Sequence, residues 1–221
     1  MKRLAIETST ECCSVALQIG AEVIQRKNIE ARSHAHLILP WSQALLAEAG
    51  LGFRDLDGLA VSRGPGGFTS LRIGLGIVQG LALARDLPVH PVSSLLTLAE
   101  SADPDQRHSQ LLALLDARMG QIYAAWYERR DGRRERLGPE LLVDPDQLEC
   151  PHPGPWLAVG PGASAFRDDL VAQLGDAVQM HSPTADTIWP DARALLRLAD
   201  TEPAVPGHRI SPTYLRDQVT G

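Results

Sequence analysis

Three short runs of apolar and β-branched residues, separated by small polar turns, fill the N-terminal part of the chain. They cover residues 4–10, 13–19 and 21–29. Short apolar runs between turn residues are typical of strands. We therefore expect a meander of three antiparallel strands at the start of the chain.

Longer amphipathic stretches then alternate with short buried ones. We expect helices over residues 33–49, 71–85 and 93–102, and strands over residues 59–62 and 89–92. Ser33 is a candidate cap for the first helix, and Pro40 inside it predicts a kink, because proline removes one backbone hydrogen bond. A meander followed by alternating helices and strands predicts an α/β fold.

A polar stretch with a proline, residues 101–110, is the best candidate for a domain boundary. After it, we expect strands at 111–115 and 121–127, a solvated hairpin tip of mixed charge, a strand near 157–159, helices at 164–174 and 190–199, and an extended tail over 202–221. The sequence thus predicts two domains, residues 1–102 and 103–221, with a tail that is free to return to the first.

A glycine-rich loop joins the strand before Ser62 to the next helix. It contains Gly64, Pro65, Gly66 and Gly67, and Thr69 or Ser70 can cap the helix that follows. Such a loop is either a structural tight turn or a place where helix amides face an anion or a neighbouring backbone. The Gly-x-Gly spacing of Gly74 and Gly76 is not a dinucleotide fingerprint, because it lies inside the helix. The loop is not a Walker loop either, because no Gly-Lys-Ser/Thr follows it.

The composition narrows the class of protein. The chain has 221 residues, of which 44% are hydrophobic, which is enough for one or two cores. The net charge of −6 argues against a protein that binds nucleic acid by itself. We expect no membrane span and no signal peptide. Cys12 and Cys13 are expected to be packed strand residues rather than nucleophiles, and the protein is expected in the cytoplasm.

Two helices carry broad apolar faces. Gly76 and Gly80 lie one turn apart on the glycine-loop helix, which flattens a face that also carries Ile73, Ile77 and Ala84. Because apolar residues surround this helix, we expect its own sheet to bury one side and another subunit to cover the other. The helix over residues 33–49 carries a similarly broad apolar surface.

Several motifs together resemble the TsaB (YeaZ) family. They are I-E-T-S-T, S-H-A-H-L-I-L-P, G-P-G-G-F-T-S-L-R-I-G, L-D-A-R-M-G-Q-I-Y-A-A-W and P-T-Y-L-R. The resemblance implies the actin/Hsp70/sugar-kinase fold, with a mixed sheet flanked by helices in each domain. It also implies a scaffold and activator for the bacterial synthesis of threonylcarbamoyladenosine (t6A) at position 37 of tRNAs that read codons starting with adenine.

In the resembled family, the catalytic subunit TsaD uses threonylcarbamoyl-AMP made by TsaC, and the ATPase TsaE docks on the pair. This implies that the chain binds TsaD and TsaE, forms a homodimer when alone, and meets tRNA only through the complex. It also implies no catalytic, cofactor-binding or metal-binding residues, since ATP and metal belong to the partners. Face geometry and resemblance together predict these interface residues: Leu37, Trp41, Leu45, Ile73, Ile77, Gly80 and Ala84.

Two alternatives stay open. The chain could be a kinase or ATPase of the same fold, with Asp116 and Arg118 either contacting a ligand or closing a hairpin. It could, as the weakest alternative, be a peptidase that uses Ser9, Ser62 or Ser70, although none of these lies in a nucleophile elbow.

Overall fold

The computed structural model describes residues 1–30, 33–181 and 187–216. The chain divides into two compact units. Unit 1 comprises Met1–Thr97 and Pro190–Thr213, and unit 2 comprises Leu98–Trp189 and the residues from Tyr214 on. The expected boundary at residue 102 differs from this division in two ways: the division lies inside helix α3 (Ser94–Ala102), and residues 190–213 belong to the first unit.

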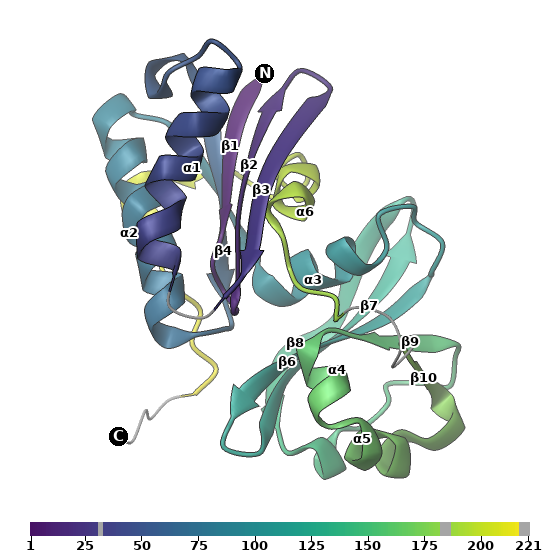
Figure 1. The fold of residues 1–221 in the computed structure, drawn as a ribbon. Helices are drawn as coiled ribbons and strands as arrows, with labels where there is room; N and C mark the ends of the chain where they lie inside the picture. The colour runs from purple at the N-terminus through teal and green to yellow at the C-terminus, as the bar shows by residue number, and fades with distance from the viewer. Residues whose placement is uncertain (31–32, 182–186, 217–221) are drawn as a thin grey trace. The chain divides into compact units, whose positions relative to one another are not determined.

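Unit 1 is built on a six-stranded mixed sheet with the order β11-β5-β4-β1-β2-β3 (Figure 1). The expected meander is confirmed, since β1, β2 and β3 pair antiparallel, while β4 and β5 run parallel to β1. The strands are β1 (Lys2–Glu7), β2 (Cys12–Ile19), β3 (Glu22–Ile29), β4 (Gly58–Gly64), β5 (Pro88–Ser93) and β11 (Val205–Pro206).

Helices cover both faces of this sheet. α1 (His34–Glu48) and α2 (Phe68–Arg85) lie side by side on one face, and α6 (Ala192–Leu198) packs on the other (Figure 1). The α1–α2 face buries the larger side chains of the strands, such as Leu4, Ile6 and Leu17, whereas the α6 face buries mainly small ones. This split follows from the alternation of side chains along each strand. Because α6 packs on this sheet, residues 190–213 belong to unit 1.

Unit 2 repeats the central arrangement of unit 1. Its five-stranded sheet has the order β10-β9-β6-β7-β8, in which β6, β7 and β8 are antiparallel and β6, β9 and β10 are parallel. Taken from the other edge, β8-β7-β6-β9-β10 has the same sequence of strand directions as β3-β2-β1-β4-β5 of unit 1. The strands are β6 (Gln110–Arg118), β7 (Gln121–Arg130), β8 (Arg133–Val143), β9 (Trp156–Val159) and β10 (Val178–Met180).

The helices of unit 2 pack on one core. The single helix expected over residues 164–174 is wrong, because the segment forms α4 (Pro161–Ala165) and α5 (Arg167–Leu174). Phe166 leaves the helical conformation between them, with φ −118°. Leu170 and Leu174 of α5 join the core around Trp126 and Trp156, whose rings meet edge to face.

The two expected helix caps have different outcomes. Ser33 is the N-cap residue of α1, as expected, but its hydroxyl donates to the Glu30 carbonyl oxygen and makes no cap bond to the helix. α2 begins one turn earlier than expected, with Gly67 as its N-cap, so neither Thr69 nor Ser70 caps it. Pro40 lies within α1, which continues through it.

The tail after α6 is partly extended, as expected, and adds β11 to the edge of β5. Its last residues, 217–221, lie outside the described residues. Within the described ranges, no helix has the length and hydropathy that crossing a membrane requires.

Candidate functional site

The glycine loop packs against the turn between β1 and β2. The Gly67 amide donates to the Ser9 carbonyl oxygen at 2.8 Å. A Cβ at Gly66 would lie 2.2 Å from the same oxygen. Of the two partners considered for this helix start, an anion or a neighbouring backbone, the Gly67 amide therefore faces backbone. Glycine is required at Gly66 because two backbones approach each other there.

The C-terminal tail holds the other side of the loop. The Thr213 amide donates to the Arg63 carbonyl oxygen at 2.7 Å, and Arg63 Nη1 donates to Thr213 Oγ1 at 2.9 Å. Gly64 has φ +107°, and a Cβ there would lie 2.8 Å from the Thr213 carbonyl oxygen. The loop is thus fixed between the first turn and the tail. Sequence reasoning missed this contact, because no local pattern links residues so far apart.

Glu7, at the end of β1, is fully buried beneath the turn. Its carboxyl accepts a hydrogen bond from the Ser9 amide at 2.6 Å and one from the Ser62 hydroxyl. Burial raises the pKa of Glu7, although these hydrogen bonds oppose the rise. The carboxyl therefore ties the turn after β1 to β4.

Of the three serines considered for peptidase chemistry, two have internal partners, and the Ser9 hydroxyl is buried without a hydrogen-bond partner among the described residues. Ser62 donates to Glu7, and the Ser70 hydroxyl donates to the Gly67 carbonyl oxygen at 3.2 Å. Cys12 is buried in β2, and burial raises its pKa to about 12. Since the thiolate is the nucleophilic form, this thiol is unreactive at neutral pH.

Asp116 and Arg118 close the β6–β7 hairpin. The Asp116 carboxylate accepts the Arg118 amide at 2.7 Å and pairs with the Arg118 guanidinium at 3.0 Å. Of the two roles considered for this pair, these bonds are those of the hairpin role. No group of three or more His, Cys, Asp or Glu side chains could hold a metal ion in the part of the chain that the structure describes.

The outer surface of α2 contains the most exposed of the predicted interface residues. Gly80 and Ala84 are exposed, and so is Gly76 one turn earlier. A Cβ at Gly76 or Gly80 would meet no atom within 4 Å. The buried stripe of the same helix, which includes Leu71, Leu75 and Val78, faces the sheet. The glycines therefore leave a flat strip on the side turned away from the core.

The other predicted interface residues lie closer to the core. Ile73, Ile77, Leu37 and Trp41 are half-buried and pack against the core of unit 1. Leu45 is only 1% exposed and belongs to that core, so its predicted contact with a partner is wrong. The reason is that Leu45 continues the inward stripe of α1 rather than its outer one.

Three exposed large apolar side chains lie on α1 and α2, and none of them was among the predicted interface residues. Leu83 is 84% exposed, Phe68 48% and Leu39 40%. The Arg72 guanidinium stacks over the Phe68 ring at 3.3 Å from its centroid. Large apolar residues exposed on adjacent helices are typical of a surface that another protein covers. Helix periodicity alone could have found Leu83, which lies one turn after Gly80.

The fold and the glycine loop place the chain in a class of two-unit α/β proteins. The family model described as "TsaD: tRNA N6-adenosine threonylcarbamoyltransferase" matches residues 21–218. The tRNA threonylcarbamoyladenosine biosynthesis protein TsaB of Escherichia coli K12 is 36% identical over 99% of this chain and 96% of its own length. The TsaB of Haemophilus influenzae is 34% identical over 98% of this chain and 94% of its own.

Solved structures agree. YeaZ from Pseudomonas aeruginosa is 34% identical with a TM-score of 0.84, over 97% of this chain and 99% of that chain. A protein described as similar to peptidase YeaZ from the same organism is 33% identical with a TM-score of 0.88 over the same shares. The chain belongs to the TsaB (YeaZ) family. The expected actin/Hsp70/sugar-kinase type of fold, with a helix-flanked mixed sheet in each unit, is confirmed.

Proposed function

We propose that the chain is a non-catalytic subunit in the formation of t6A on tRNA. The observation that carries the proposal is the full-length similarity to proteins named for t6A biosynthesis, 36% and 34% identical. In this role the chain binds the catalytic subunit TsaD and, with the ATPase TsaE, supports transfer of the threonylcarbamoyl group to N6 of adenosine 37. It meets tRNA only through the complex and works in the cytoplasm.

The glycine loop supports a non-catalytic role. In the proposed role, the loop is a structural joint, because its Gly67 amide already donates to Ser9 and its Gly66 Cα lies against the same carbonyl group. Glu7 is likewise engaged by Ser9 and Ser62 rather than by solvent. A ligand phosphate would have to displace these contacts. We infer that ATP and metal are used by the partner subunits and not by this chain.

The outer strip of α2 supports a partner-binding role. Gly76 and Gly80 let a second helix approach closely, and the exposed Leu83 beside them supplies apolar area. We infer that TsaD packs against this strip together with the exposed part of α1. When the chain is alone, a second copy covers the same strip and forms a homodimer, so the two complexes compete.

The test is an omission experiment. Unmodified tRNA, threonine, bicarbonate and ATP are incubated with TsaC, TsaD and TsaE from the same organism, with and without this chain, and t6A is measured by mass spectrometry. ATP hydrolysis by the chain alone is measured in parallel. The proposal requires t6A only when the chain is present and no hydrolysis above a blank by the chain alone. Equal t6A without the chain, or sustained hydrolysis by the chain alone, contradicts it.

A further inference from the structure

The open edge of the first sheet is β3, and it lies far along the sheet from the opposite edge strand β11. β11 has two residues and ends in Pro206, and a short strand with proline is a protected edge. β3 has eight residues and no proline. An edge of this length presents a row of backbone N–H and C=O groups that another strand can pair with.

The register shows which residues direct those groups outward. β2 and β3 are joined by the two-residue loop Gly20–Ala21, and Ile19 pairs with Glu22. The residues that flank a two-residue hairpin loop form a hydrogen-bonded pair, and the pattern then alternates along the strands. Val23, Gln25, Lys27 and Ile29 therefore direct their backbone groups to the open edge. The Val23 carbonyl agrees, since its partner in the described part of the chain is the Arg193 side chain, which lies outside the sheet at 3.5 Å.

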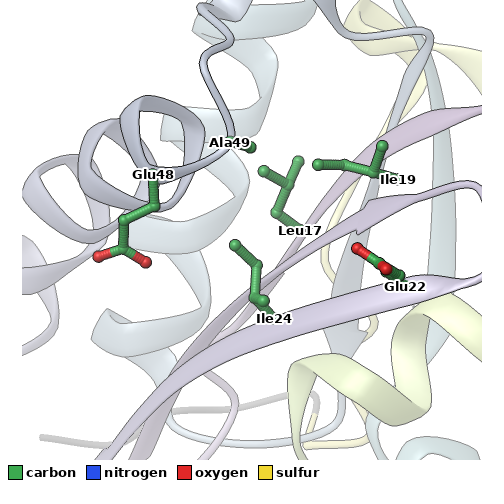
Figure 2. A pocket seen from close by; sticks show the side chains of 6 residues that line it. All are labelled: Leu17, Ile19, Glu22, Ile24, Glu48 and Ala49. Carbon is green, nitrogen blue, oxygen red and sulfur yellow. The ribbon is translucent and has the colours of Figure 1, made fainter.

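A hollow lies beside this edge, on the face that carries α1. Figure 2 shows its lining: Leu17, Ile19, Glu22, Ile24, Glu48 and Ala49. Leu17 is buried, and the 36% exposed Ile24 projects from β3 itself. The hollow thus has an aliphatic floor, and its member on the edge strand, Ile24, is the residue that a side chain of an added strand would contact.

The polar groups of the hollow are acidic. Glu22 precedes Ile24 by two residues on β3, so both side chains are on the same face. Glu48, at the end of α1, forms an exposed ion pair with Arg26. In the described residues no ion pair involves Glu22. An occupant with a lysine or arginine near Glu22 and an aliphatic side chain over the floor would match both the charge and the apolar area.

We propose that β3 binds an extended segment of a partner protein, which adds as a strand to this edge. The segment runs parallel to β3, and its side chains that face the hollow follow the pattern Lys/Arg-x-Val/Ile, in which the aliphatic residue packs on Ile24 and the cation faces Glu22. Backbone hydrogen bonds to β3 provide affinity, and the hollow provides specificity. This surface is separate from the α2 strip and does not depend on the function proposed above.

The probe for the test is a disulphide-closed β-hairpin peptide whose outer strand reads Thr-Lys-Thr-Val-Thr. Binding to the full isotope-labelled chain is followed by NMR, residue by residue. We expect saturable shifts over residues 22–29 and slower hydrogen exchange of the Val23, Gln25 and Lys27 amides. A peptide with glutamate in place of lysine should bind at least tenfold more weakly.

Two matched variants complete the test. Ile24→Lys should weaken binding of the lysine peptide at least tenfold, whereas Ile29→Lys should change it less than twofold. Ile29 is 54% exposed on the same strand but on the other face, away from the hollow. The proposal is overturned by equal effects of the two variants, by equal binding of the glutamate peptide, or by no saturation at 1 mM peptide. It is also overturned if the peptide-free chain shows concentration-dependent broadening over residues 22–29, because a second copy would then occupy the edge.

Discussion

At the residue scale, glycines do two opposite things along residues 64–80. At Gly66 there is no room for a Cβ, because the Ser9 carbonyl oxygen would lie 2.2 Å from it. At Gly76 and Gly80 the space is open. The first is a packing requirement inside the molecule, whereas the others cost helix stability without any internal contact in return. Helix glycines with open space around them, such as Gly76 and Gly80, indicate selection for a contact with another molecule.

This contrast gives the first prediction. Gly66→Ala should lower the free energy of unfolding by about 2–4 kcal/mol, because the β1–β2 turn must move to admit the methyl group. Gly76→Ala is the matched control and should raise it by up to about 1 kcal/mol, since alanine is the better helix former. Urea unfolding measures both. Similar effects of the two substitutions would contradict the packing described for the loop.

Glu7 gives a prediction about pH. Its pKa is raised above the ordinary 4.5 by burial, so the folded chain keeps a proton that the unfolded chain releases. Stability from this group is full below pH 4.5 and declines as pH rises through the folded-state pKa. The decline for one proton is at most about 1.4 kcal/mol per pH unit. Glu7→Gln should remove it, and unfolding measured between pH 4 and 8 checks this.

The control for that experiment is Glu149→Gln, which changes an exposed carboxyl of the same type. It should leave the pH profile of stability as in the unaltered chain. A Glu7→Gln profile that is as steep as the original would mean that Glu7 keeps its charge in the folded protein.

At the residue scale, the sequence predicted the structural role of a residue better than it predicted the residue's hydrogen-bond partner. The loop glycines and the buried cysteines could be predicted, because backbone freedom and apolar character are local properties. The Ser62–Glu7 bond and the Thr213–Arg63 bonds could not, because each joins residues that only the complete fold brings together. The same limit explains the wrong cap at Thr69 or Ser70 and the missing side-chain cap bond at Ser33, because both depend on how the chain enters the helix.

At the scale of elements, the sides of α2 have different surroundings. One side holds the sheet through Leu75 and Val78, one flank carries the tail through Gln79, which donates to the Ile210 carbonyl oxygen at 3.0 Å, and the outer strip is open. Periodicity predicted the helix and its apolar circumference. Periodicity did not distinguish Leu45 of α1, which is buried in the core, from Ala84 of α2, which lies on the surface. Both residues fit an apolar helix face.

The outer strip gives a prediction about association. Gly80→Arg should abolish binding to TsaD, since a long charged side chain would stand in a close helix contact. The free energy of unfolding should be unchanged or higher by up to about 1 kcal/mol, because arginine favours helix over glycine. Size-exclusion chromatography of the mixed subunits and urea unfolding measure the two effects.

A matched pair of variants controls for charge. Ala84→Arg should weaken the same complex, whereas Ala172→Arg, an identical change at an exposed position of α5 in unit 2, should not. Loss of folded protein with Gly80→Arg would instead mean that the strip belongs to the core. Retained binding by both strip variants would mean that TsaD binds elsewhere.

At the scale of the whole molecule, the two units share one strand arrangement, but different helices pack on it in each unit. The sequence showed the α/β class and a second unit, yet it hid the repetition, because the two sheets share topology and not motifs. It allowed the tail to return to the first unit but assigned the helix before it to the second, since nothing local indicates that α6 packs on the sheet of β1. Each unit has its own core.

Within unit 2, Asp103 anchors the polar stretch that follows α3. Its buried carboxylate accepts the amides of Arg107 and His108 and pairs with the Arg134 guanidinium at 2.7 Å. Burial raises its pKa, but the hydrogen bonds and Arg134 outweigh it, so the net pKa is lowered from 3.8. This stabilisation is therefore present above pH 3.8 and is lost as pH falls through the folded-state pKa.

Asp103→Asn should destabilise the protein by about 3 kcal/mol at neutral pH, because it removes the carboxylate that pairs with the buried Arg134 at 2.7 Å. Asp105→Asn removes an exposed partner of Arg107 and should cost about 0–1 kcal/mol. Thermal unfolding at pH 7 compares them. Equal costs would show that Asp103 acts through its backbone hydrogen bonds alone.

The most direct test of the central claim is t6A formation at a fixed concentration of TsaC, TsaD and TsaE, titrated with either the unaltered chain or the Gly80→Arg variant. The account predicts that the unaltered chain raises the yield to a plateau near equimolar TsaD, while the folded variant leaves it at the level without the chain. Equal titration curves for the two proteins would contradict the claim that this chain acts by docking through the outer strip of α2.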